Sequence, residues 1–123
     1  MGKLFKFQEW PVYKTAERLN LLVSEIHFIN GPKIGRLDLI DQLKRASSSI
    51  ILNLAEGYGR ATKKDKLSFL RISRGSTYEC VAITDIMNSI GIINVTIHQK
   101  IHRELFEIAK MLGGLIRHIE SKS

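Results

Sequence analysis

The chain has 123 residues, 44% of them hydrophobic and 25% charged, and its 19 lysines and arginines outnumber its 12 aspartates and glutamates to give a formal net charge of +7. This length and composition suit one folded domain and exclude a disordered or fibrous chain. The single cysteine excludes an intramolecular disulfide, and no apolar run approaches the roughly 20 residues of a membrane span or forms the core of a secretory signal. We therefore expect a single cytoplasmic domain over residues 1–123.

Apolar residues recur at steps of three and four in four stretches of the chain, which is the spacing of one helix face. The predicted helices cover approximately residues 9–30, 38–60, 63–90 and 97–120. Short connections between long helices place sequential neighbours antiparallel. The predicted fold is therefore all-α, an antiparallel up-down-up-down four-helix bundle.

The first predicted helix has Pro11 in its opening turn, where the missing N–H of proline costs nothing, and it ends before the Gly31-Pro32 pair. The side chains ahead of this helix are too apolar for a free tail. We expect them to dock on the bundle or on a neighbouring subunit: Leu4, Phe5, Phe7 and Trp10.

The second predicted helix is central, because its apolar surface is wider than one stripe. Either Asp38 or Asp41 can cap its start. The small side chains of residues 46–49 predict a close crossing with a neighbouring helix. Asn53 and Glu56 fall on or beside the apolar surface, so we expect each to be paired across a helix interface or with a backbone group.

The third predicted helix begins at a capping box, Thr62 with Asp65, and closes at Gly91. A glycine inside a helix costs about 1 kcal/mol relative to alanine, so Gly75, with Ser76 beside it, predicts close backbone packing against Ser48. The expected buried side of this helix carries mostly bulky residues: Leu67, Phe69, Leu70, Ile72, Ser76, Val81, Ile83, Ile86 and Ile90.

Glu79 falls on the same predicted stripe, where a carboxylate needs a partner, and either Arg45 or Asn53 of the second helix can supply one. The last predicted helix opens with a second capping box, Thr96 with Gln99. We expect structural roles for the polar residues of the two middle helices: Arg45, Asn53, Glu56 and Glu79.

Several residues have part of the pattern of a metal-binding or reactive site, but none has the whole pattern. His98 and His102 are four apart, as in a zinc-binding helix, but no third ligand follows, so we expect solvated surface histidines. Glu56 and Glu79 lack the Glu-x-x-His feature of di-metal bundles. Cys80 has no activating neighbour in sequence and is expected to pack inertly. The sequence thus predicts no catalytic residue, metal or cofactor, and no enzyme.

Basic side chains concentrate around the second predicted helix and the turn that follows it. Residues 31–64 carry seven lysines and arginines against three acidic side chains, whereas residues 65–95 balance. Clustered cations bind phosphates because they release counterions from a polyanion. The candidate nucleic-acid-binding residues are Lys44, Arg60, Lys63, Lys64, Lys66, Arg71 and Arg74.

A family resemblance rests on three groups of residues: the string Gln42-Leu43-Lys44-Arg45-Ala46-Ser47-Ser48-Ser49-Ile50; the run Asn53-Leu54-Ala55-Glu56-Gly57 with Arg60; and Phe69, Gly75-Ser76 and Glu79. With these residues the chain resembles the bacterial four-helix bundle proteins encoded in intervening sequences of 23S rRNA genes, often labelled S23 ribosomal protein. The family is related to the accessory variability determinants of retroelements, which bind nucleic acid and a reverse transcriptase. The resemblance implies a four-helix bundle that assembles as a homopentamer.

Two functions are compatible with this sequence. The first is a non-enzymatic, oligomeric bundle that binds RNA or DNA through its basic surface, contacting the backbone without base specificity, since no base-reading motif is present. The alternative is a structural or adaptor ring that binds a protein partner without touching nucleic acid. Neither function involves a membrane.

Overall fold

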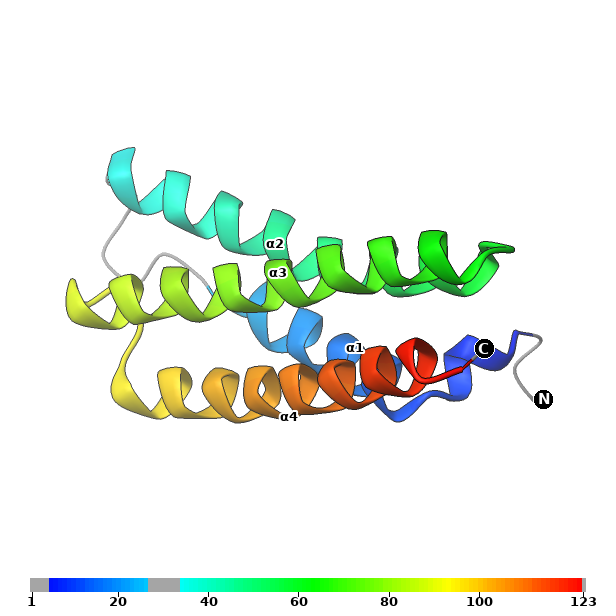
Figure 1. The fold of residues 1–123 in the computed structure, drawn as a ribbon. Helices are drawn as coiled ribbons and strands as arrows, with labels where there is room; N and C mark the ends of the chain where they lie inside the picture. Colours follow the sequence, from blue (N-terminus) through cyan, green and yellow to red (C-terminus); the bar gives the residue numbers. More distant parts are fainter. Residues whose placement is uncertain (1–4, 27–33, 123) are drawn as a thin grey trace.

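The computed structural model describes residues 5–26 and 34–122, and for residues 34–37 it describes the backbone alone. The helical elements, in chain order, are η1 (Lys6–Glu9), α1 (Pro11–Ser24), α2 (Ile34–Gly59), α3 (Lys63–Ser89) and α4 (Val95–Glu120). The four long helices form an all-α four-helix bundle, as predicted (Figure 1). Helices α1 and α3 each pack against both α2 and α4.

Sequential helices in the bundle run antiparallel. The ammonium of Lys63, at the start of α3, donates to the carbonyl of Glu120, at the end of α4, with a separation of 2.9 Å. The ring of Phe7 in η1 lies 5.4 Å from that of Tyr58, near the end of α2. The end of α2, the start of α3 and the end of α4 therefore meet at one end of the bundle, where the α2–α3 turn and the C-terminus appear together in Figure 1.

Three predicted boundary features are confirmed. Pro11 occupies the first turn of α1. Thr62 caps α3, and its hydroxyl oxygen accepts from the backbone N–H of Asp65 at 3.1 Å. Gly91 follows the end of α3 with a φ of +80°, a left-handed conformation that glycine adopts without the steric cost of a Cβ.

Other predicted boundaries are wrong. Helix α2 begins at Ile34, so Asp38 and Asp41 lie inside it and cap nothing. Helix α4 begins at Val95, because the side chain of Asn94 accepts from the backbone N–H of Ile97 at 2.9 Å and caps the helix ahead of Thr96. Helix α1 ends at Ser24. The predicted stop at Gly31-Pro32 lies outside the described residues.

The core draws on all four helices, and its fully buried side chains include Leu19, Leu43, Ile50, Leu54, Leu70, Met87, Ile101, Leu105, Ile108 and Leu112. The buried side of α3 differs from the predicted stripe. Ile72, Ile86 and Ile90 are 48%, 49% and 52% exposed. Buried residues around the helix middle instead include several hydroxyl side chains and the cysteine: Ser73, Ser76, Thr77, Cys80, Ile83, Thr84 and Met87.

The buried hydroxyl groups of α3 find partners inside the protein. The hydroxyl of Thr77 donates to the carbonyl of Ser73, one turn earlier, and that of Ser73 donates across the interface to the carbonyl of Ile50 in α2. Within the described residues, every buried side-chain nitrogen and oxygen has a hydrogen-bond partner. Satisfied polar atoms avoid the desolvation cost that otherwise keeps polar side chains out of cores.

The predicted close packing between α2 and α3 occurs at other residues. Ser48 and Gly75 are both exposed, and a Cβ built on Gly75 would meet no atom within 4 Å, so the prediction for this pair is wrong. Ser76 is buried as expected, and its hydroxyl lies 2.9 Å from that of Ser49. The tight contact is at Gly57, where a Cβ would lie 3.3 Å from the Cβ of Phe69.

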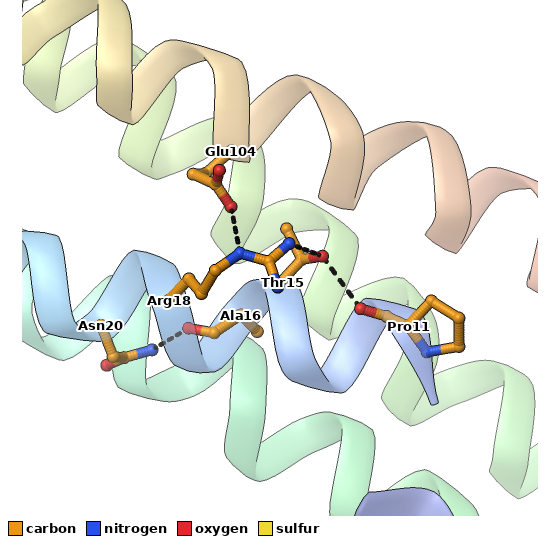
Figure 2. Close-up of polar contacts among 6 residues, drawn as sticks. All are labelled: Pro11, Thr15, Ala16, Arg18, Asn20 and Glu104. Atoms are coloured by element: carbon orange, nitrogen blue, oxygen red, sulfur yellow. Dashed lines mark hydrogen bonds and ion pairs between the residues drawn. The ribbon is translucent and has the colours of Figure 1, made fainter. Parts of the chain in front are cut away.

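Helix α1 is fixed by polar contacts as well as by its apolar face (Figure 2). The guanidinium of Arg18 pairs with the Glu104 carboxylate of α4 at 3.3 Å and donates to the hydroxyl of Thr15 at 2.8 Å. The amide of Asn20 donates to the carbonyl of Ala16 at 2.9 Å and to that of Ser47 in α2 at 3.0 Å. These contacts orient α1 toward both of its neighbours.

Candidate nucleic-acid interface

The α2–α3 turn has a local structural cause. A Cβ built on Gly57 would lie 3.3 Å from the Cβ of Phe69 and 3.4 Å from the carbonyl oxygen of Lys66. A larger residue at this position would therefore push α3 away from the end of α2. Thr62 then caps the first turn of α3. The turn thus presents a group of cations at this end of the bundle, which we call the basic end: Arg60, Lys63, Lys64, Lys66 and Arg71.

Two lysines of the basic end contact neutral groups. Lys63 donates to the backbone carbonyls of Glu120 and Lys122. Lys66 donates to the backbone carbonyl of Tyr58 at 2.9 Å. Carbonyl oxygens at the ends of helices carry partial negative charge and orient an ammonium group, but they do not cancel a full positive charge. Lys63 and Lys66 are therefore held in place while they keep their charges.

Two arginines of the basic end are paired with carboxylates. Arg60 contacts Glu56, one turn earlier in α2, at 2.9 Å, and Arg71 contacts Glu120 of α4 at 2.7 Å. Lys64 is exposed and makes no hydrogen bond or ion pair with the described residues. Two of the predicted cations are thus paired with carboxylates inside the protomer. The three lysines make no ion pair with the described residues, and the exposed Asp65 lies between Lys64 and Lys66 in the sequence.

The other two candidate residues lie apart from the α2–α3 turn. Lys44 precedes Arg60 by 16 residues, which is about 24 Å along a helix at 1.5 Å per residue. Arg74 is half-buried and lies about one turn beyond Arg71 in α3. Lys44 therefore does not belong to the basic end, and Arg74 extends it along α3.

Of the four polar residues predicted to have structural roles, Asn53 is partly buried and the other three are exposed. The amide of Asn53 donates to the carbonyl and the hydroxyl of Ser49 at 2.8 and 3.0 Å, so it is paired within α2. Glu56 is exposed. The prediction of a buried Glu79 is wrong, because Glu79 and Arg45 are both exposed and line an open groove of about 410 Å³ between α2 and α3.

An aromatic cluster lies beside the basic end, and the sequence did not predict that its rings meet. The ring of Tyr58 lies 5.4 Å from those of both Phe7 and Trp10, and Phe7 meets Tyr13 edge-on at 5.2 Å. The expected docking of the N-terminal segment is thus confirmed for Phe7 and Trp10, whereas Phe5 is 58% exposed and Leu4 lies outside the described residues. The apolar residues ahead of the first helix indicate in the sequence that this segment docks, but nothing in the sequence identifies Tyr58 of α2 as the residue it contacts.

The cations of the basic end also contact aromatic rings. The ammonium of Lys66 lies 5.9 Å from the centre of the Tyr58 ring, and the guanidinium of Arg60 lies 4.6 Å from that of Phe69. Such cation–π contacts stabilise a side chain by about 0.5–1 kcal/mol where it is exposed. They also place positive charge next to flat apolar surfaces.

The histidines of α4 are arranged differently from the prediction. His98 is not a fully solvated side chain, because it is 20% exposed and its Nε2 lies 2.8 Å from a carboxylate oxygen of Asp85 in α3. The rings of His98 and His102 are 6.2 Å apart. Over residues 5–26 and 34–122, the structure contains no group of three or more potential metal ligands.

Cys80 is fully buried in the core. Burial raises the pKa of its thiol from 9.0 to about 12, and the neighbouring Glu79 carboxylate adds to the increase. The thiolate is the reactive form of cysteine, so this side chain is a poor nucleophile at neutral pH.

The fold and the basic end together define a helical bundle with several cations gathered at one end, and none of the described helices is long and apolar enough to cross a membrane. A model of the 23S rRNA-intervening sequence protein family matches residues 8–114. The chain therefore belongs to the 23S rRNA-intervening sequence protein family.

Solved structures support the same fold. The chain is similar to a protein of unknown function from the S23 ribosomal protein family of Bacteroides thetaiotaomicron, whose crystal structure was determined at 1.70 Å resolution. The TM-score is 0.76 at 18% identity, and the match covers 86% of this chain and 95% of the other. Among curated proteins, no sequence matches this chain significantly.

Proposed function

We propose that this protein is a non-enzymatic bundle that binds the phosphate backbone of RNA or DNA through its basic end. The observation that carries this proposal is the pairing of Lys63 and Lys66 with neutral carbonyls, beside Lys64, which makes no ion pair with the part of the chain that the structure describes. These contacts fix the positions of two ammonium groups at one end of the bundle and do not cancel their positive charge. Binding of this kind contacts phosphates and does not read bases.

Affinity measured across a salt series tests this proposal. Each phosphate contact contributes about 0.7–0.9 to the slope of log K against log salt concentration, so affinity should fall steeply between about 50 and 200 mM salt. The variant Lys63→Gln/Lys64→Gln/Lys66→Gln should bind more weakly and show a slope shallower by about 2. The matched control is Lys100→Gln/Arg103→Gln/Lys110→Gln, which removes the same charge from exposed positions of α4. Equal losses in both variants, or no binding at low salt, would refute the proposal.

We also propose that copies of the protein associate through the face shared by α2 and α3. Ile72, Ile86 and Ile90 are about half exposed, and their spacings of 14 and four residues keep them on one side of α3. Leu52 of α2 is 62% exposed. Arg45 and Glu79 supply opposite charges at the groove between the two helices. Apolar side chains with complementary charges are suited to association, and a symmetric ring would repeat the basic end and add avidity.

Native mass measurement tests the association. Ile86→Glu should lower the assembly state, because it places a charge in the proposed contact. Tyr78→Glu is the matched control, since Tyr78 of α3 is 57% exposed and lies outside the isoleucine set. A wild-type monomer at micromolar concentration would refute the association. An intact ring that ignores nucleic acid at low salt would instead favour the adaptor alternative.

A further inference from the structure

The aromatic cluster and the basic end enclose a small pocket. It has a volume of about 230 Å³ and is lined by Trp10, Gly57, Tyr58, Lys66, Leu70, Leu115 and Ile119. This is below the roughly 300–1,000 Å³ typical of pockets for drug-sized ligands, so it suits a single ring system. Its surface is almost entirely apolar, and the charged side chain that lines it is Lys66.

The position of Lys66 connects the pocket with phosphate binding. Its ammonium is fixed by the carbonyl of Tyr58 at 2.9 Å and lies 5.9 Å from the centre of the same residue's ring. A phosphate held by Lys66 would therefore bring the adjoining base to the pocket that Tyr58 and Trp10 line. In duplex nucleic acid the bases are stacked inside the helix and cannot reach such a surface, whereas an unpaired base can.

We propose that the basic end selects single-stranded nucleic acid, with one unpaired base stacked in the pocket formed by Trp10 and Tyr58 and its phosphate at Lys66. This inference rests on the proposed nucleic-acid binding and specifies its substrate. Base–aromatic stacking accepts any base because every base has a π face. An apolar pocket wall offers few hydrogen bonds to distinguish one base from another, which fits recognition without sequence preference.

Trp10 is the only tryptophan of the chain, so its fluorescence reports directly on this pocket. The experiment compares single strands of about 12 nucleotides, oligo-dT and oligo-rU, with a blunt duplex of equal length at low salt. Both single strands should quench Trp10 emission and bind at least about tenfold more tightly than the duplex, which should leave the emission unchanged. A single-strand preference restricted to RNA or to DNA would overturn the idea that an apolar pocket makes the selection.

Substitutions at Tyr58 separate stacking from charge. Tyr58→Leu keeps an apolar side chain but removes the aromatic face, and it should weaken single-strand binding roughly 5- to 150-fold while leaving duplex binding unchanged. Tyr58→Phe retains the face and should bind as the wild type does. Thermal unfolding of each variant confirms that the fold is intact.

The outcomes distinguish this inference from the proposed function. Binding that depends on the lysines, but is equal for duplex and single strand and insensitive to Tyr58→Leu, would overturn the stacking pocket and leave backbone binding standing. No binding of either form would overturn both. Trp10 emission that changes with protein concentration in the absence of nucleic acid would assign the aromatic cluster to a contact between subunits and overturn the pocket.

Discussion

The middle of α3 and its first two turns use polar side chains in opposite ways. In the middle, the hydroxyls of Ser73, Thr77 and Thr84 are buried and donate to backbone carbonyls. In the first turns, Lys63 and Lys66 also donate to carbonyls, but at the surface and with a charge that the carbonyl leaves in place. Hydrogen bonds to backbone carbonyls therefore stabilise the core in the middle of α3, whereas in its first turns they orient the proposed binding surface.

The largest expected effect lies at the border between these regions. Leu70 is 1% exposed, so Leu70→Ala should lower the free energy of unfolding by about 2–5 kcal/mol through lost burial and a cavity. Denaturant unfolding measures this loss. Affinity for a nucleic-acid duplex, which does not enter the pocket that Leu70 lines, should stay unchanged under conditions where the variant is folded. A loss of duplex affinity there would mean that packing at Leu70 and the lysines of the binding surface are not independent.

Ile72 provides the control for that prediction. It lies two residues beyond Leu70 and is 48% exposed, so Ile72→Ala should cost no more than about 1 kcal/mol in unfolding measured on the monomer. A cost equal to that of Leu70→Ala would mean that the sequence periodicity had located the buried face correctly.

The sequence predicted the four long helices and their antiparallel order, because apolar spacing at steps of three and four marks the buried side of a helix. It misplaced the buried face of α3. Hydrophobicity assigned burial to Ile72 and Ile86, whereas Ser73, Thr77 and Thr84 occupy the core because each hydroxyl finds a carbonyl to satisfy it. A pattern of residue types does not reveal such local pairing.

The candidate site was predicted less completely than the fold. The turn cations were identified from their clustering, but the pairing of Arg71 with Glu120 joins residues that are 49 apart in sequence. The meeting of Phe7 and Trp10 with Tyr58 is equally distant along the chain. Tertiary contacts of this kind depend on which helix ends meet. The amphipathic spacing of each helix does not specify that arrangement.

The next largest effect concerns pH. The folded-state pKa of Cys80 is about 12, against 9.0 for an ordinary thiol, so above about pH 9 the unfolded state loses a proton that the folded state retains. Stability should be unaffected by this group below pH 9 and should fall as pH rises from 9 toward 12. At pH 10 the loss is on the order of 1 kcal/mol.

Cys80→Ala isolates this contribution from other groups that titrate at high pH. The difference in unfolding free energy between wild type and variant should be constant from pH 6 to about 8.5 and should then shift in favour of the variant. A thiol reagent should modify the wild type only after unfolding. Rapid labelling of the folded protein at neutral pH would contradict the burial on which the raised pKa depends.

A smaller effect, of opposite sign, is expected at Gly75. This residue is exposed inside α3 and a Cβ there meets nothing within 4 Å, so Gly75→Ala should stabilise the monomer by about 0.5–1 kcal/mol through helix propensity. Gly57→Ala should not show this gain, because its Cβ would lie 3.3 Å from that of Phe69. Thermal unfolding of both variants tests the contrast, and a destabilising Gly75→Ala would indicate close packing after all.

The smallest effect on stability is expected at the paired arginine of the basic end. The ion pair of Arg71 with Glu120 is about half exposed, and such pairs contribute about 0–1 kcal/mol. Glu120→Gln should therefore change unfolding by no more than about 0.5 kcal/mol, yet it should free Arg71 for a phosphate and steepen the salt dependence by about 0.7–0.9. Glu107→Gln removes the same charge from an exposed position of α4, 13 residues earlier, and should leave the slope unchanged. If Glu120→Gln instead weakens binding, the ion pair holds Arg71 in the position needed for binding. Pairing with a carboxylate would then not be the reason that the arginines bind less than the lysines.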